Sequence, residues 1–262
     1  GPHESGLYKM MAIGLGNQRG AEAVHAAGFG RMGANVPAYA RVTLATGKIL
    51  FGVAVVENAF DDTCLIEAML PEQIAVREPA LLEEAKRLMP HLKFDPIDVL
   101  VCDQIGKNFS GDGMDPNITA SYITPYATGG PKVERYVILD LSEETHGNAI
   151  GTGVAHFTTK RVFDKTDFDA TYPNALTCRV VLGARMPLVV ATDRMAIQGA
   201  IYTVTEGDPT RPRIVRIANT SHVDEIEISE ALLEEAGRRD DIEILEEPRD
   251  WSFDRDGNLF PV

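Results

Sequence analysis

Cysteine is scarce in this sequence of 262 residues, which contains only Cys64, Cys102 and Cys178. No two of them form a C-x-x-C pair. An odd, scattered set argues against a disulfide framework and indicates a reducing compartment, so we expect a cytoplasmic protein. We interpret each thiol as a small, buried apolar group.

Long apolar runs are also absent. The longest, Ile49–Val56, has the length of a β-strand, whereas a membrane helix needs about 18 or more apolar residues. No signal peptide is visible either. We therefore expect no membrane partner.

Several common catalytic signatures are missing as well. The sequence has no G-x-S-x-G motif and no H-E-x-x-H motif. Gly14, Gly16 and Gly20 suggest a dinucleotide-binding loop, but their spacing is one residue too long and no strand precedes them. This argues against nicotinamide binding and leaves a flexible turn where the backbone approaches another group closely.

Acidic residues outnumber basic ones, 39 to 25, which gives a formal net charge of −14. Such a surface repels phosphate backbones, so we expect neither nucleic acid nor an anionic membrane as a partner. The remaining composition is ordinary for a globular protein, with 44% hydrophobic residues. A chain of this length can bury a sizeable core.

The first part of the chain predicts short helices and one hairpin. Apolar spacing predicts helices over residues 20–27, 30–47 and 79–89, and strands over residues 49–56 and 63–70. The segment Pro90–Pro96 marks a boundary, so we expect distinct units over residues 1–92 and 93–262. A hairpin and a few helices do not enclose a core of their own, and we expect the first unit to be incomplete.

Strands and helices alternate in the second part, which predicts an α/β architecture with a largely parallel sheet. The predicted strands cover residues 97–102, 136–141, 188–192, 213–217, 225–228 and 242–245. The predicted helices cover residues 153–165, 169–180, 193–204 and 230–239.

Two polar loops follow strands of this sheet, where ligands bind in open α/β folds. The loop Asp103–Asn117 carries three glycines and Lys107, which suits an anionic ligand, although a plain surface loop would look similar. The loop Asp140–Asn148 contains His146, which serves either the site or only a turn. We interpret His156 and His222 as histidines whose hydrogen bonds are satisfied within the fold.

Several segments resemble one family, the lactate-racemase-like proteins that depend on a nickel-pincer nucleotide. These segments are Glu4–His25, Asp103–Asn117, Leu139–Asn148 and Asn219–Glu234. The resemblance covers almost the whole chain and is closest to an uncharacterised branch. It implies a two-domain architecture, in which residues 1–92 are the C-terminal part of a cofactor-binding N-terminal domain with a hinge helix. Residues 93–262 would then form a complete C-terminal α/β domain.

In the racemase, a lysine is joined covalently to the cofactor and a histidine sixteen residues later ligates the nickel. Lys9 and His25 match both residue types at that spacing. The resemblance therefore implies that Lys9 and His25 bind the nickel-pincer nucleotide and that His25 is a metal ligand, a role that suits imidazole. Without a cofactor, Lys9 is a surface charge and His25 a helix histidine.

The family reaction implies a small-molecule substrate, a 2-hydroxy acid or a related alcohol, and we assign Lys107 and His146 as candidate catalytic residues. In the racemase, a glutamine and a lysine after an Asp-x-Asn element bind the substrate. Here Asp115-Pro-Asn117 is followed by neither residue type. The identity of the substrate therefore does not carry over.

The acid–base histidines of the family belong to a segment that precedes the cofactor lysine and is not in this sequence. We therefore expect a fragment, a processed form or half of a split protein, inactive as a racemase by itself. Its expected partner is a separate N-terminal chain or a further copy in a homo-oligomer. The alternative is a non-catalytic binding or assembly module that folds without cofactor.

Overall fold

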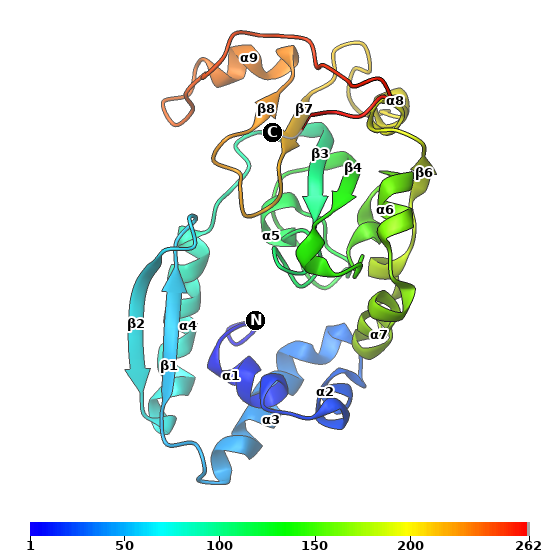
Figure 1. Cartoon of the computed structure of the whole chain (residues 1–262). Coiled ribbons are helices and arrows are strands. Elements are labelled where there is room, and N and C mark those ends of the chain that lie inside the picture. Colours follow the sequence, from blue (N-terminus) through cyan, green and yellow to red (C-terminus); the bar gives the residue numbers. More distant parts are fainter. Residues whose placement is uncertain (261–262) are drawn as a thin grey trace. The chain divides into compact units, whose positions relative to one another are not determined.

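The computed structural model describes residues 1–260, and the chain folds into two compact units. Unit 1 comprises Gly1–Pro90 and the short stretch Leu176–Val180, and unit 2 comprises His91–Ala175 and the chain from Val181 onward. Figure 1 labels the helices and strands. The hairpin of unit 1 and the six-stranded sheet of unit 2 are separate sheets.

Unit 1 opens with a series of short helical elements. In chain order they are α1 (Leu7–Lys9), the π-helical turn η1 (Met10–Gly14), α2 (Gln18–His25), the 3-10 turn η2 (Phe29–Arg31) and α3 (Met32–Ala45). The helices predicted over residues 20–27 and 30–47 are confirmed apart from their ends. Both α2 and α3 pack against η1, which makes this π-turn the centre of the helical part.

The predicted hairpin is confirmed, and a longer helix follows it than predicted. β1 (Gly52–Glu57) pairs antiparallel with β2 (Thr63–Met69), and α4 (Pro71–Leu88) comes next. The prediction that this helix starts at Pro79 is wrong. Pro71 occupies the first helical turn, where a missing N–H costs little, and Pro79 lies inside the helix.

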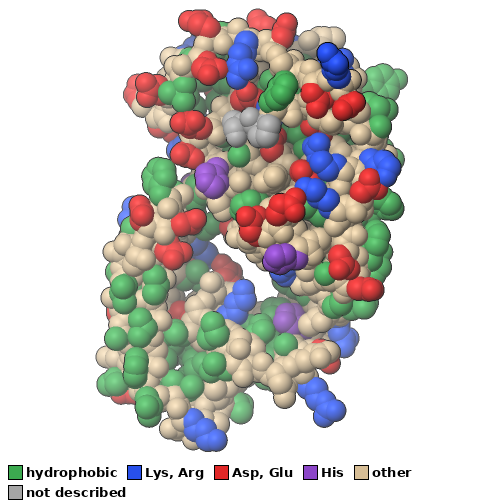
Figure 2. Space-filling model, viewed as in Figure 1, with side chains coloured by type: hydrophobic (Ala, Val, Ile, Leu, Met, Phe, Trp, Pro, Cys, Tyr) green, Lys and Arg blue, Asp and Glu red, His purple; other side chains and the backbone are tan. Residues whose placement is uncertain are grey.

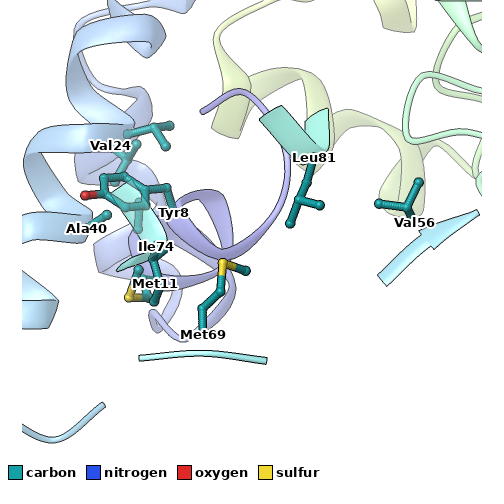
Figure 3. Packing of buried hydrophobic residues seen from close by; sticks show 10 residues of the cluster. Tyr8, Met11, Val24, Ala40, Val56, Met69, Ile74 and Leu81 are labelled. Atoms are coloured by element: carbon teal, nitrogen blue, oxygen red, sulfur yellow. The ribbon is translucent and has the colours of Figure 1, made fainter. Parts of the chain in front are cut away.

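One face of the hairpin is buried and the other is exposed. Val56 and Met69 belong to a cluster of buried side chains that also includes Tyr8, Met11, Val24, Ala40, Ile74 and Leu81 (Figure 3). The opposite face presents Val53, Val55 and Ile66, whose exposed fractions are 45, 52 and 67%. Figure 2 shows apolar side chains gathered over the hairpin at the lower left. The prediction that the first unit does not enclose a core of its own is therefore wrong, because unit 1 encloses a small core on one side of its sheet.

Unit 2 confirms the α/β class and the largely parallel sheet. The strand order is β6-β5-β4-β3-β7-β8, and only β8 runs antiparallel to its neighbour. The strands are β3 (Ile97–Ile105), β4 (Val133–Leu141), β5 (Phe157–Thr159), β6 (Leu188–Val190), β7 (Ile214–Ile217) and β8 (Glu227–Ile228). The α-helices are α5 (Pro116–Thr119), α6 (Lys160–Lys165), α7 (Phe168–Cys178), α8 (Asp193–Tyr202) and α9 (Glu230–Ala236).

The helix predicted over residues 153–165 is wrong in its first half, which contains β5. Phe157, Thr158 and Thr159 are buried there. The two threonine hydroxyls each donate a hydrogen bond of 2.8 Å to a carbonyl oxygen of β4. Aromatic and β-branched residues suit a buried strand, so tertiary contacts override the helical spacing. The strand predicted over residues 242–245 is also wrong, because those residues form no strand.

The strand order changes direction at β3, and this places the polar loops. From β3 the chain adds β4, β5 and β6 on one side, and β7 then pairs with β3 on the other side. The buried core lies between these central strands and α8, and includes Val99, Val137, Phe157, Ala196 and Ala200. A crevice forms outside the carboxyl ends of strands at such a reversal, where ligands bind in α/β folds.

Candidate functional site

Lys9 is the last residue of α1, and its side chain is exposed. The π-turn η1 begins directly after it. Single π-turns are rare in proteins. Those that exist lie frequently at functional sites, because they bulge a helix and re-aim its side chains. Within residues 1–260, the Lys9 amine has neither a hydrogen-bond partner nor an ion-pair partner.

A buried carboxylate fixes the chain just before Lys9. Glu78, on α4, is 4% exposed and accepts a hydrogen bond of 3.0 Å from the backbone N–H of Tyr8. The same carboxylate lies 2.8 Å from His3 Nδ1, and the His3 ring stacks on Tyr8. A Cβ on Gly6 would lie 2.5 Å from Glu78 Oε1, so only glycine allows this approach. Sequence analysis missed Glu78, although an acidic residue on the apolar face of a helix is a signal.

His25 ends α2 and is half-buried. Its Nδ1 lies 2.7 Å from the backbone oxygen of Ala21. A carbonyl oxygen can only accept, so Nδ1 carries the proton and Nε2 keeps its lone pair. Histidines that bind metals are usually oriented in this way, with the other ring nitrogen donating to a carbonyl or a carboxylate. The chemistry of this donor therefore fits a metal ligand through Nε2.

His25 belongs to no larger group of metal-ligating side chains in the described residues. Within residues 1–260, no group of three or more His, Cys, Asp and Glu side chains is arranged to hold a metal ion.

The two other predicted residues, Lys107 and His146, lie on neighbouring loops of unit 2. The backbone N–H of Lys107 donates to Thr145 Oγ1 at 3.1 Å, and its Nζ donates to Asn174 Oδ1 at 2.7 Å. His146 is exposed and has a left-handed backbone with φ of 50°. The fold therefore joins these loops, and both side chains reach the surface.

Glycines allow the loops after β3 and β4 to interlock. A Cβ on Gly113 would lie 2.3 Å from the backbone oxygen of Ile150. A Cβ on Gly151 would lie 1.9 Å from the backbone oxygen of Asp112. The glycines of the first loop were interpreted as suited to an anionic ligand, whereas Gly113 permits close backbone contact.

A cavity of about 550 Å³ lies at the carboxyl ends of β3, β4 and β7, and all of its lining residues belong to unit 2. We call it the carboxylate–arginine pocket. Neither Lys107 nor His146 lines it. Its charged and ionisable lining residues are Asp103, Asp140, Arg161, Asp193, Arg216, His222, Asp224 and Glu225.

Arg216 is a deeply buried cation of the pocket, with 3% of its side chain exposed. Its Nε and Nη2 donate to the two carboxylate oxygens of Asp103, at 2.8 and 2.7 Å. Nη1 donates to Glu227 Oε2 at 2.8 Å, and Nη2 also donates to the backbone oxygen of Phe260. Such a two-point pair is geometrically specific. Together, the hydrogen bonds of Arg216 connect β7 with β3, β8 and the C-terminal tail.

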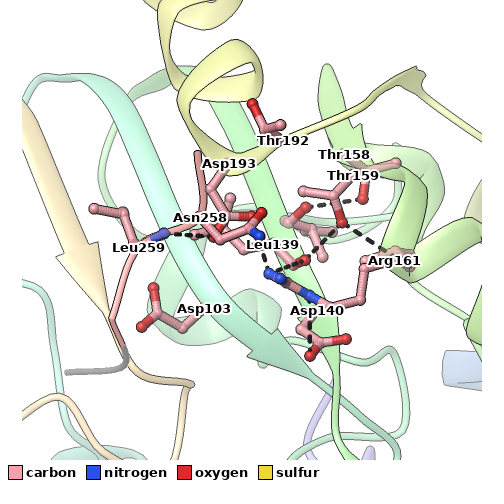
Figure 4. A network of polar contacts seen from close by, with 12 residues as sticks. Asp103, Leu139, Asp140, Thr158, Thr159, Arg161, Thr192, Asp193, Asn258 and Leu259 are labelled. Carbon is pink, nitrogen blue, oxygen red and sulfur yellow. Dashed lines mark hydrogen bonds and ion pairs between the residues drawn. The ribbon is translucent and has the colours of Figure 1, made fainter. Parts of the chain in front are cut away.

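Arg161 lies between two carboxylates (Figure 4). Its Nη2 donates to Asp193 Oδ1 at 2.9 Å and to the backbone oxygen of Leu139 at 3.0 Å. Its Nε lies 3.2 Å from Asp140 Oδ2 without the alignment of a hydrogen bond. Burial raises the pKa of the Asp193 carboxyl, and the charge of Arg161 opposes this effect. Arg161 therefore compensates a carboxylate that is almost completely buried.

His222 stands at the mouth of the pocket, after β7. Its Nδ1 lies 3.1 Å from Asn219 Oδ1, which also accepts from the backbone N–H of Ser221. The amide oxygen can only accept, so Nδ1 carries a hydrogen, and in the neutral imidazole Nε2 is then an acceptor. The sequence pattern did not single out Arg216, although a charge inside an apolar strand signals a buried pair.

Comparison with protein-family models, with curated proteins and with solved structures finds no match to this chain. Within the described residues, no helix has both the length and the apolar character needed to cross a membrane. The geometry of the two units is therefore the basis for assigning a function.

Proposed function

We propose that this chain carries the cofactor segment of a racemase or epimerase of the nickel-pincer type, acting on a 2-hydroxy acid or a related alcohol. Lys9 is the covalent tether and His25 is the nickel ligand. The observation that supports this most directly is the hydrogen bond of 2.7 Å from His25 Nδ1 to the Ala21 carbonyl, which leaves Nε2 available.

Three features of unit 1 support the tether role of Lys9. Its amine is exposed, so a bulky group can be attached without displacing the core. The π-turn η1 follows it and packs against α2, the helix that ends at His25. Glu78 anchors the preceding residue, Tyr8, by a hydrogen bond of 3.0 Å. Glu78 is thus a positioning residue in this proposal.

A bound cofactor of this type supplies hydride-acceptor chemistry that side chains lack. The side chains of this chain then bind and orient the substrate and move its proton. The Lys107 ammonium, held 2.7 Å from Asn174 Oδ1, pairs with the substrate carboxylate. His146, on the neighbouring loop, is the candidate general base of this chain for the hydroxyl proton.

Mass spectrometry of the chain, produced together with the enzymes that make the cofactor, tests the tether. We expect peptide mapping to place an adduct on Lys9. Lys9→Arg should abolish the adduct, and Lys48→Arg, at another exposed lysine of unit 1, should retain it. An unmodified Lys9, in a host that loads a known nickel-pincer racemase in parallel, contradicts the proposal.

A second candidate is a non-catalytic binding module, and a specific observation favours it. The carboxylate–arginine pocket is lined by unit 2 alone, so it needs nothing from unit 1. A module of this kind would stay free of adduct and nickel in the same experiment and would still bind a small molecule through unit 2.

A further inference from the structure

The carboxylates of Asp103, Asp140 and Asp193 in the carboxylate–arginine pocket are each paired with a cation. Asp103 pairs with Arg216 at 2.7 Å, and Asp193 pairs with Arg161 at 2.9 Å. Asp140 lies 3.0 Å from Lys165 and 3.2 Å from Arg161. A buried charge is stable only with a counter-charge, and these counter-charges are already present. A strongly charged ligand would therefore have to break an existing pair in order to bind to one of these three carboxylates or their cations.

The rim of the pocket also disfavours one class of charged ligand, the anions. Asp224 and Glu225 line the opening and are exposed. Both carry negative charge, and no cation of the described residues is paired with either. Anionic ligands are therefore repelled at the entrance, and carboxylates and phosphates are poor candidates.

The polar groups of the pocket that remain available to a ligand include both hydrogen-bond donors and hydrogen-bond acceptors. Arg161 Nη1 donates to no atom within residues 1–260, and the half-buried Gln104 amide offers one of each kind. His222 Nε2 is an acceptor, because Nδ1 is committed to Asn219. A hydroxyl group is itself both a donor and an acceptor, so it can pair with either type.

We propose that this pocket binds a neutral polyhydroxylated small molecule of the aldose or polyol class. Its hydroxyls hydrogen-bond to Arg161, Gln104 and His222, and its C–H faces lie against apolar lining residues such as Leu139 and Leu259. A volume of about 550 Å³ falls within the usual range of about 300–1,000 Å³ for small-molecule sites. The proposal does not rest on the nickel cofactor, and its test needs none.

Ligand-observed NMR with the full chain tests the proposal. The neutral probes are D-ribose, D-mannitol and myo-inositol, and the charged probes are lactate and putrescine. We expect at least one neutral probe to bind and neither charged probe to compete with it. Gln104→Leu and Arg161→Lys should each weaken binding about tenfold, the usual effect of losing one hydrogen bond to a charged or buried group.

The matched control is Gln18→Leu, at an exposed glutamine of unit 1, which should bind the probe like the wild type. Circular dichroism shows whether each variant is folded. Gln104→Leu disturbs no ion pair, so it remains informative if Arg161→Lys does not fold. Absence of binding for all three neutral probes overturns the proposal. So does competition by lactate or putrescine, or unchanged binding in Gln104→Leu.

Discussion

Asp103 and Arg216 are 113 residues apart in the sequence, and they form a two-point ion pair across the central strands β3 and β7. The two hydrogen bonds measure 2.8 and 2.7 Å, and Arg216 is 3% exposed. The pair closes one side of the carboxylate–arginine pocket. It also lies at the point where the strand order reverses, so the stability of unit 2 and the shape of its pocket depend on the same contact.

Replacing Arg216 by methionine should destabilise unit 2 strongly. The change leaves the carboxylates of Asp103 and Glu227 without their main partner, and breaking a buried pair from one side typically costs about 3–5 kcal/mol. Urea unfolding measures the loss. Arg249→Met is the control, because Arg249 reaches Glu227 only at 3.4 Å and is 61% exposed. We expect that change to cost at most about 1 kcal/mol. Equal effects of the two substitutions would contradict this account of the pocket.

His156 should make unit 2 less stable in mild acid. Its Nδ1 accepts a hydrogen bond of 3.0 Å from the backbone N–H of Tyr136, which protonation would remove. Burial, and then the charge of Arg135, lower the pKa of His156 from its ordinary 6.5. The unfolded chain therefore binds the proton first as the pH falls. The contribution of His156 is complete above pH 6.5 and is lost as the pH falls below that value.

Unfolding by urea at about pH 7.5 and about pH 5 tests this sign. His156→Asn can keep the hydrogen bond through its amide oxygen and has no proton to gain. We expect the loss of stability between the two pH values to be smaller in this variant than in the wild type. An identical loss in both proteins would rule out His156 as a source of the pH dependence.

The contact between the loops after β3 and β4 should not tolerate a side chain at Gly151. Its φ is 101°, and a Cβ would lie 1.9 Å from the Asp112 oxygen. We expect Gly151→Ala to cost about 2 kcal/mol or more, because backbone strain and a steric clash add. A Cβ at Gly111 meets nothing within 4 Å. Gly111→Ala should leave stability unchanged or raise it by up to about 1 kcal/mol. Thermal unfolding of both variants provides the comparison.

The two faces of the hairpin should respond differently to truncation. Met69 is 2% exposed and belongs to the core of unit 1. Met69→Ala should therefore cost about 2–5 kcal/mol. Ile66 lies on the opposite face and is 67% exposed, so Ile66→Ala should change stability by about 0.5 kcal/mol at most. A larger loss for Ile66→Ala would mean that its face is covered in solution.

Much of the fold was predictable from local patterns. The apolar runs of β3 and β4 and the hairpin strands were found because periodicity and length agree with burial. The predicted helix over residues 153–165 failed because Phe157–Thr159 gain buried contacts in the sheet that helical spacing does not reveal. The start of α4 was misplaced because Pro79 was interpreted as a beginning, whereas it lies in the interior.

The pocket was much less predictable than the loops. Asp103 was visible because it directly follows an apolar strand. Its partner Arg216 is 113 residues away, and no local pattern joins the two. Arg161 lies in α6, within the correct half of the helix predicted over residues 153–165, but no local pattern marked it as a pocket residue. The resemblance to the nickel-pincer family placed Lys9 and His25 in one segment, and the hydrogen bond to Ala21 that orients His25 could be recognised only from coordinates.

Nickel content per chain tests the central claim most directly. The protein would be purified from a host that makes the nickel-pincer nucleotide, and nickel would be measured by mass spectrometry beside His25→Ala and His91→Ala. His91 is an exposed histidine in unit 2 and serves as the control. The account predicts about one nickel per chain in the wild type and in His91→Ala, and a loss of about 10-fold or more in His25→Ala. Nickel that stays equal in all three proteins, or is absent from the wild type while a racemase loads in the same host, would contradict it.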